Sequence, residues 1–154
     1  MCMSYLEMEK QFKIYVYQEG EPPMFHDGPC KSIYSTEGRF IHEMERGHNM
    51  YRTTDPDEAL VYFLPFGVVM LVQYLYEPRS RETHAIGRAM VNYIDAVAAN
   101  HPFWNRSLGA DHFMLFCHDW VMILNIVISR PVENKSIFTV WPSLHERKIL
   151  WDCR

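Results

Sequence analysis

The stretch Ala59-Leu60-Val61-Tyr62-Phe63-Leu64-Pro65 decides the fold class, because it is an unbroken apolar run directly behind the turn-forming residues Asp55-Pro-Asp-Glu58. A strand that is covered on both faces has such a sequence, whereas a strand with one solvent face alternates apolar and polar residues. Strands of this kind are typical of parallel sheets that lie between helices. We therefore expect residues 59–65 to form a buried strand of a parallel sheet.

Two further segments have strand character, one on each side of this run in the sequence. Residues 12–17 alternate aromatic and β-branched side chains, and Glu19-Gly-Glu-Pro-Pro23 ends them. Residues 112–117 are again short, apolar and bounded by polar residues. Both segments are predicted to be strands, which makes three in all.

Helical periodicity lies between the predicted strands. In residues 35–44 apolar side chains recur at helical spacing, and Gly47 follows as a stop signal. Residues 83–99 carry a longer apolar stripe, made of Ile86, Met90, Tyr93, Ile94 and Val97. The alternation of strand and helix predicts an α/β fold: a partial Rossmann-like parallel sheet with flanking helices and right-handed crossovers, and not a barrel.

The composition is that of a globular domain. With 154 residues, of which 48% are hydrophobic and 22% charged, the chain can form a core and is neither disordered nor collagen-like. Its net charge of −4, without a long basic stretch, argues against nucleic acid as a partner. No signal peptide is visible, and the aliphatic run 121–128 is interrupted and too short to cross a bilayer, so the chain by itself reads as soluble.

The spacing of cysteines and histidines predicts neither a metal site nor a resident cofactor. The four cysteines contain no Cys-x-x-Cys pair, which excludes a zinc ribbon; three disulfide pairings stay open, and free or buried thiols are the favoured interpretation. The eight histidines show neither His-x-x-x-His nor His-Glu-x-x-His spacing. Glycine-rich phosphate loops and the Gly-x-Ser-x-Gly elbow are also missing from the sequence.

Two histidine–aspartate pairs bracket the third predicted strand and are the main catalytic candidates. Asp111 and His112 lie at its start, and His118 and Asp119 follow its end, about 20 Å away if the strand is extended. An imidazole beside a carboxylate is suited to act as a general base. Ligands of open α/β sheets lie beyond the carboxyl ends of the strands, which favours the second pair. For the first pair, capping of the strand start by backbone hydrogen bonds is the favoured alternative.

Two loops carry weaker motifs. His26-Asp-Gly-Pro-Cys30 is either a binding turn or, as we favour, ordinary turn chemistry. Asn105-Arg-Ser107 is a glycosylation sequon in a predicted loop, which makes Asn105 a candidate glycosylation site.

A set of separated motifs points to a known family. The motifs are Phe12-Lys-Ile-Tyr-Val-Tyr17, Tyr34-Ser-Thr-Glu-Gly-Arg-Phe40, Asp55-Pro-Asp-Glu-Ala59, Val61-Tyr-Phe-Leu-Pro65, Pro102-Phe-Trp-Asn-Arg106, Gly109-Ala-Asp-His-Phe113 and His118-Asp-Trp120. Through their order and spacing, residues 8–120 closely resemble the first half of the plant exostosin-like glycosyltransferases, glycosyltransferase family 47. Agreement of many separated motifs is specific where one motif would be weak.

The resemblance implies a type II membrane protein of the Golgi with a lumenal catalytic part. It implies transfer of a sugar from a nucleotide-sugar, a UDP-sugar, to a cell-wall polysaccharide or a glycan, including protein glycosylation, and association with other glycosyltransferases. The implied fold has two facing Rossmann-like domains of the GT-B type. The first domain would hold the acceptor and the second the donor.

The resemblance also implies roles for individual residues. One group must take the proton of the acceptor hydroxyl, and the matching candidates are Asp111, His112, His118 and Asp119. Arg39 is a second-choice candidate for hydrogen bonding to a sugar, and Trp104 for stacking on a sugar face.

Behind Trp120 the sequence stops resembling the family. Residues 121–154 are expected to be an irregular, divergent tail, and neither the anchor nor the second domain of the family is visible. Since the donor half stabilises the leaving diphosphate, we expect the chain alone to be inactive. Two alternatives stay open: a non-catalytic carbohydrate- or partner-binding module that uses Trp104, Tyr62 and Phe103, and, with less support, a metal-dependent hydrolase.

Overall fold

The computed structural model describes residues 5–46, 49–78, 84–115, 117 and 138–140. Within them lies one sheet in the order β2-β1-β3-β4-β5. Its strands are β1 (Ile14–Val16), β2 (Arg52–Thr53), β3 (Val61–Phe63), β4 (His112–Leu115) and β5 (Phe138–Val140). Every neighbouring pair is parallel. The predicted parallel sheet is therefore confirmed, with the apolar run 59–65 supplying its central strand.

The sheet has more strands than the sequence predicts. Residue 138 begins β5, in a stretch for which no regular element is expected, and β2 consists of two residues, Arg52 and Thr53, that are too few to show a period. The three predicted strands stand side by side as β1, β3 and β4, with Tyr15 level with Tyr62 and Tyr62 level with His112. This register places three aromatic side chains in one row on one face of the sheet.

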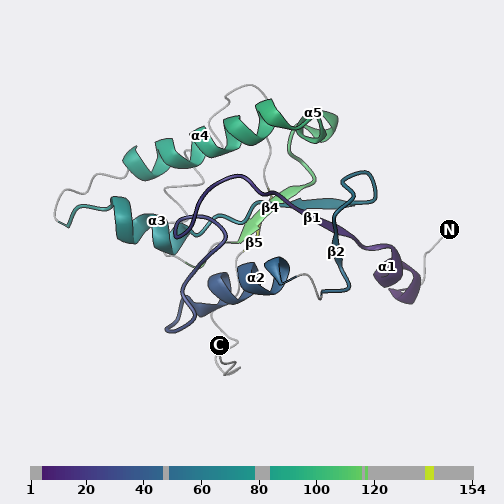
Figure 1. Ribbon diagram of the computed structural model, residues 1–154, viewed down its shortest axis with the longest axis horizontal. Helices are drawn as coiled ribbons and strands as arrows, with labels where there is room; N and C mark the ends of the chain where they lie inside the picture. The colour runs from purple at the N-terminus through teal and green to yellow at the C-terminus, as the bar shows by residue number, and fades with distance from the viewer. Residues whose placement is uncertain (1–4, 47–48, 79–83, 116, 118–137, 141–154) are drawn as a thin grey trace.

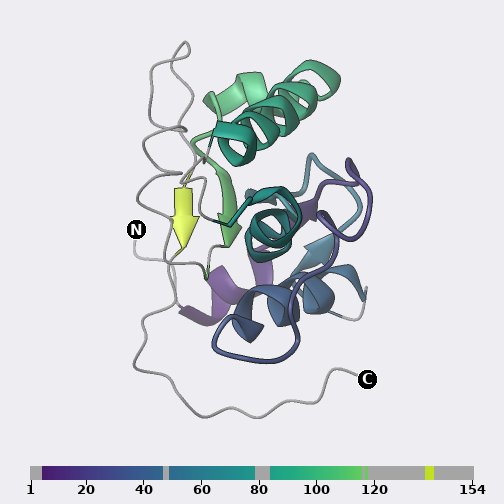
Figure 2. The same cartoon turned by 90° about the vertical axis from the view of Figure 1, so that its left-hand side faces the viewer.

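Helices cover both faces of the sheet (Figures 1 and 2). They are α1 (Tyr5–Gln11), α2 (Ser35–Glu45), α3 (Val68–Leu75), α4 (His84–Asn100) and α5 (Phe103–Ser107). On one face, α2 packs Ile41 and Met44 against Val16 and Phe63. On the other face, α3, α4 and α5 cover the aromatic row. The layers are those expected of a parallel α/β sheet.

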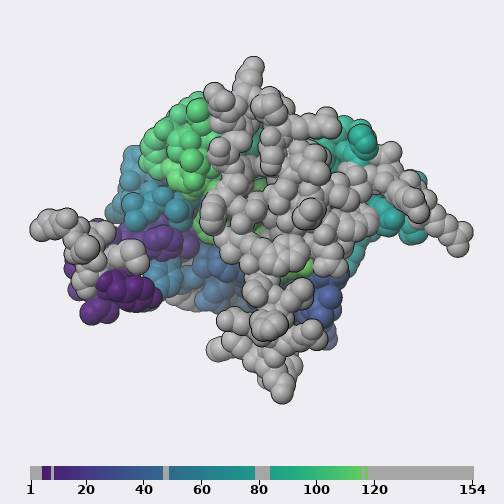
Figure 3. All heavy atoms as spheres, turned by 180° about the vertical axis from the view of Figure 1, so that it is seen from behind, coloured from purple at the N-terminus to yellow at the C-terminus, as the bar shows by residue number. Residues whose placement is uncertain are grey.

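The two predicted helices are confirmed as α2 and α4, and all members of the apolar stripe of α4 are buried. Three described helices, α1, α3 and α5, are missing from the sequence-based expectation. The sequence of α3, Val68–Leu75, is rich in β-branched residues and has no capping side chain of its own at Gly67. With five residues, α5 is too short to show a period. In Figure 3, α1 and α5 lie at the same end of the molecule, as they do in Figure 1.

The oxidation state of the cysteines differs in part from the prediction of free or buried thiols. Cys30, in the loop between β1 and α2, is disulfide-bonded, whereas Cys117 is a free thiol. The expectation was therefore wrong for Cys30, because cysteine count and spacing say nothing about which chain segments the fold brings together. Among the described residues, no helix has the length and apolar character that crossing a membrane requires.

Candidate functional site

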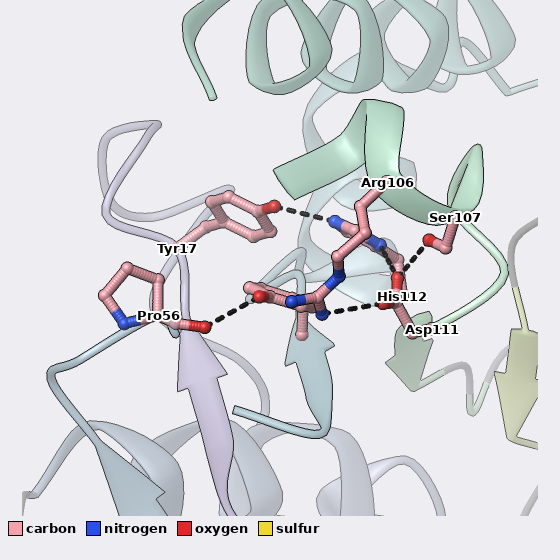
Figure 4. Close-up of polar contacts among 7 residues, drawn as sticks. Tyr17, Pro56, Arg106, Ser107, Asp111 and His112 are labelled. Carbon is pink, nitrogen blue, oxygen red and sulfur yellow. Dashed lines mark hydrogen bonds and ion pairs between the residues drawn. The ribbon is translucent and has the colours of Figure 1, made fainter. Parts of the chain in front are cut away.

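The first predicted catalytic pair lies in a buried network at the start of β4. The side chain of His112 is fully buried, and both of its ring nitrogens have partners. Its Nε2 lies 2.7 Å from the hydroxyl of Tyr17, which follows β1, and its Nδ1 lies 2.8 Å from Oδ1 of Asp111 (Figure 4). The network therefore connects two strands that are separated by β3.

Helix α5 completes the network around Asp111. Arg106 donates to Oδ2 of Asp111 over 3.0 Å, and the Ser107 hydroxyl donates to Oδ1 (Figure 4). The Arg106 guanidinium also lies 5.1 Å from the centre of the Tyr62 ring. Tyr62 in turn donates its hydroxyl to the carbonyl oxygen of Pro56 over 2.7 Å. The side chains of Tyr17, Tyr62, Asp111 and His112 are therefore all paired, next to several aromatic rings.

The electrostatics fix the protonation of the network. Burial alone would raise the pKa of Asp111, but hydrogen bonds from Ser107 and Arg106 and the contact with His112 lower it overall. Desolvation lowers the pKa of His112 by more than Asp111 raises it, and burial raises the pKa of the Tyr17 hydroxyl. Near neutral pH the carboxylate is thus ionised, the imidazole neutral and the phenol protonated. Because the carboxylate only accepts, Nδ1 of His112 donates to it and Nε2 accepts from Tyr17.

Aromatic rings pack closely against the imidazole of His112. The His112 ring is stacked on the Tyr62 ring at 4.8 Å and 14°, and the Trp104 ring lies 4.5 Å from it. Phe103 is stacked on the other side of Tyr62 at 5.6 Å. An imidazole with both nitrogens engaged and aromatic rings packed against it can orient strands and helices, but it has no free nitrogen for the hydroxyl of an acceptor. The geometry thus favours a structural role for His112.

The structural role is built differently from the predicted strand cap. The backbone bonds that the sequence favours are present, since the Asp111 carbonyl accepts from the Tyr62 amide over 2.9 Å and the His112 amide donates to Gly109 over 3.0 Å. The side chains of Asp111 and His112 form a second set of bonds, to Tyr17 and to α5. Both sets hold the amino end of β4.

The other candidate residues lie in different places. His118 and Asp119 lie outside the described residues. Arg39 belongs to α2, and its Nη2 lies 3.5 Å from the carbonyl oxygen of Cys30. Trp104, predicted to stack on a sugar, is 1% exposed and packs on His112 instead. Asn105 is exposed on α5, and not in a loop as predicted. The structure therefore brings Asp111, His112 and Trp104 together and leaves Arg39 apart from them.

The turn motif behind β1 is tied to α2. His26 bonds through Nδ1 to Glu45 over 2.8 Å and through Nε2 to the carbonyl oxygen of Glu19 over 3.1 Å. His42 of α2 lies 3.2 Å from the carboxylate of Asp27. These contacts are those of a structural turn. Within the described part of the chain, no group of three or more His, Cys, Asp or Glu side chains could hold a metal ion.

One buried ionisable residue was missed by sequence reasoning, Glu37 in the first turn of α2. Its carboxylate is fully buried and accepts hydrogen bonds from the backbone amides of Val69 and Cys117, over 2.9 Å and 3.2 Å. Burial raises its pKa to about 7, although these amides act in the opposite direction. A signal was available, because Glu37 precedes Ile41 by four residues and Met44 by seven, on the buried stripe of the helix.

Comparison with known proteins identifies the family. The family model of the exostosin GT47 domain matches residues 8–148, a range that extends past Trp120. A protein of Arabidopsis thaliana named a probable glycosyltransferase is 62% identical over 134 residues, which are 87% of this chain and 28% of that protein. A second probable glycosyltransferase of the same plant is also 62% identical, over 117 residues that are 76% of this chain and 22% of the relative.

A more distant relative carries a more specific name. The xyloglucan galactosyltransferase of Arabidopsis thaliana is 37% identical over 67 residues, 41% of this chain and 12% of its own length. No solved structure matches the chain. The chain spans about a quarter of the length of the two probable glycosyltransferases that it matches. With a family match over most of its residues, the chain belongs to the exostosin GT47 family of glycosyltransferases.

Proposed function

We propose that this chain is the acceptor-side part of a glycosyltransferase that moves a sugar from a nucleotide-sugar to a plant cell-wall glycan. The observation that carries the proposal is the match to the exostosin GT47 domain over residues 8–148. The parallel sheet with helices on both faces supports it, since such sheets bind ligands beyond the carboxyl ends of their strands. Because the chain spans about a quarter of its relatives, the reaction is a property of the longer protein.

The finer features of the proposal follow from the family. The donor would be a UDP-sugar held by a second domain facing this one, in a GT-B arrangement. The longer protein would face the Golgi lumen, be held by a membrane anchor and associate with other glycosyltransferases. The name of the xyloglucan galactosyltransferase supports a wall polysaccharide as one class of acceptor. On this account the 154-residue chain alone binds donor poorly and does not turn over.

For the proton transfer, we propose His118 and Asp119 as the first candidates. In the sequence they come shortly after the last residue of β4, and open parallel α/β sheets bind ligands beyond the carboxyl ends of their strands. An inverting transfer needs a base for the acceptor hydroxyl as it attacks the anomeric carbon. Asp111 and His112 stay second candidates, because their polar atoms already bond to Tyr17 and α5. The division into residues 8–120 and a divergent tail is also part of this proposal.

A chimera tests the function. Residues 8–120 would replace the matching segment of the Arabidopsis thaliana relative that is 62% identical, and UDP release would be measured with a panel of UDP-sugars and wall oligosaccharides. We expect the chimera to match the parent within a few-fold, and His118→Ala to lower kcat by about 100-fold or more. The isolated 154-residue chain should release no UDP. Turnover by the isolated chain, or a chimera that is inactive where the parent is active, would contradict the proposal.

The alternative of a non-catalytic binding module finds no support in the geometry. Its predicted stacking surface consists of Trp104, Tyr62 and Phe103. Trp104 is 1% exposed and Tyr62 is fully buried, so neither ring presents a face on the described surface. We therefore keep the transferase as the proposed function.

A further inference from the structure

Glu37 joins three elements at the carboxyl end of the sheet. It comes from the first turn of α2, and its two oxygens bond to different parts of the chain. Oε1 accepts from the amide of Val69, in the first turn of α3, over 2.9 Å. Oε2 accepts from the amide of Cys117 over 3.2 Å. Cys117 follows Leu115, the last residue of β4, in the sequence. A single carboxylate thus fixes where one helix begins and where the chain leaves a strand.

The amide of Val69 depends on this carboxylate, because it belongs to the first turn of α3. The first amides of a helix have no partner within the helix, and a side chain at the N-cap usually supplies one. At α3 the N-cap is Gly67, which has no side chain to do so. Glu37 therefore caps α3 from a different helix.

The backbone around Glu37 leaves little room for another arrangement. A Cβ atom on Gly38 would lie 2.4 Å from the carbonyl carbon of Gly28, and one on Gly67 would lie 2.6 Å from the carbonyl oxygen of Asp27. The amide of Gly67 also donates to the carbonyl oxygen of Met24 over 2.9 Å. The loop between β1 and α2 therefore lies in close contact with the starts of both α2 and α3. This close packing holds the carboxylate between its two amides.

We propose that Glu37 is a positioning residue, whose carboxylate sets the path of the chain at the carboxyl ends of the strands by holding the amides of Val69 and Cys117. The proposal deepens the proposed function, on which it rests, because the acceptor side of the transferase would be built at this edge. Glu37 itself is fully buried and does not touch substrate. Its effect on transfer would pass through the backbone of Cys117.

The surroundings of Glu37 make its charge sensitive to pH. The amides of Val68 and Val69 face it from α3, and the amide and the thiol of Cys117 face it from the end of β4. Burial raises the pKa of Glu37 to about 7, and burial together with the Glu37 charge raises the pKa of the Cys117 thiol to about 12. Only Glu37 of these two titrates near neutral pH. Since an ionised acceptor makes shorter and stronger bonds, both amides should respond to the same proton.

Nuclear magnetic resonance of the full 154-residue chain tests the proposal. The amide resonances of Val69 and Cys117 and the side-chain carboxyl carbon of Glu37 would be followed from pH 5 to pH 8.5. We expect all three to titrate together, with one midpoint near pH 7. In Glu37→Gln the shared titration should vanish, and at least one of the two amides should exchange with solvent about 10-fold faster or more, because glutamine has a single acceptor oxygen.

Glu43→Gln is the matched control, since Glu43 is an exposed carboxylate of the same helix. It should leave both the titration and the exchange rates unchanged. Different midpoints for the two amides, or a titration that persists in Glu37→Gln, would overturn the proposal. The wild-type titration decides the matter even if the variant does not fold. Since neither measurement uses a sugar or a nucleotide, a negative result here would leave the proposed function standing, whereas a failed chimera test would leave the shared titration intact and remove only its link to sugar transfer.

Discussion

Glu37 and His112 are both completely buried, yet the protein stabilises them in opposite ways. His112, at the amino end of β4, is bonded through side chains, to Tyr17 and Asp111. Glu37, at the carboxyl end, is bonded through backbone amides. The side-chain bonds at the amino end join the segment after β1 to β4 and α5. The bonds of Glu37 instead fix the backbone positions of Val69 and Cys117. Both residues should therefore contribute to stability, but only Glu37 lies at the edge where we propose that the acceptor binds.

The largest effect should come from His112→Ala. The change removes a stacked ring and leaves the Tyr17 hydroxyl and the Asp111 carboxylate with lost partners in a buried region. We expect a loss of about 4 kcal/mol in the free energy of unfolding, measured by urea denaturation. His42→Ala, at a partly exposed histidine that contacts the Asp27 carboxylate, should cost about 0.5 kcal/mol. Equal losses in the two variants would remove the contrast on which the comparison rests.

Glu37→Ala should follow, with a loss of about 3 kcal/mol. The amides of Val69 and Cys117 would lose their acceptor in a buried place. Urea denaturation gives the loss, with Glu43→Ala on the exposed side of α2 as control and an expected change within about 0.5 kcal/mol. A fully stable Glu37→Ala variant would show that water or other groups replace the carboxylate.

The pH dependence should have opposite signs at the two sites. The pKa of Glu37 is about 7 when folded and about 4.3 when unfolded, so its stabilising contribution is complete below pH 4.3 and is lost as the pH rises through 7. Between pH 5 and pH 7.5 the loss is about 2 kcal/mol. The pKa of His112 is lowered on folding, so its contribution is complete above about pH 6.5 and falls as the pH drops below that value.

Differences between wild type and single variants separate the two contributions. Unfolding free energies of wild type and Glu37→Gln would be measured at half-unit steps of pH. The difference between the two proteins should change with pH only as the ionisation of Glu37 requires. A difference between the two proteins that stays constant from pH 5 to pH 7.5 would contradict the ionisation that we assign to Glu37.

Tyr17→Phe tests the hydrogen bond between Tyr17 and His112 at the amino end of β4. The ring contacts remain, but Nε2 of His112 loses its donor. We expect a loss of about 1.5 kcal/mol in urea denaturation. Tyr74→Phe is the matched control, because Tyr74 is 61% exposed, and it should be neutral. A neutral Tyr17→Phe would indicate that the imidazole does not need this bond.

Arg106→Gln should have the smallest effect. Its side chain is 47% exposed, so its ion pair with Asp111 is screened by solvent. We expect a loss of about 0.5 kcal/mol that shrinks at high salt. A loss as large as that of His112→Ala, measured in the same way, would make Arg106 a central member of the network.

The sequence predicts the sheet better than the site, for physical reasons. The apolar run around Tyr62 carries its own signal, because a strand covered on both faces is apolar throughout. The start of α3 carries none, since its cap comes from Glu37, 32 residues earlier. Likewise, Asp111 and His112 attract attention as neighbours, but their roles depend on Tyr17, which lies 95 residues from His112 in the sequence. Local patterns predict elements, whereas the partners of buried polar groups come from the assembled fold.

The tautomer of His112 is the most direct test of the contrast between the two ends. Nitrogen resonances of its ring would be followed from pH 5.5 to pH 8. We expect the neutral ring to carry its proton on Nδ1, which donates to Asp111 while Nε2 accepts from Tyr17, and any titration of the ring to have a midpoint below the ordinary value of about 6.5. A ring that titrates with a midpoint near pH 6.5, or that carries its proton on Nε2, would contradict this expectation and would return His112 to the candidates for the catalytic base.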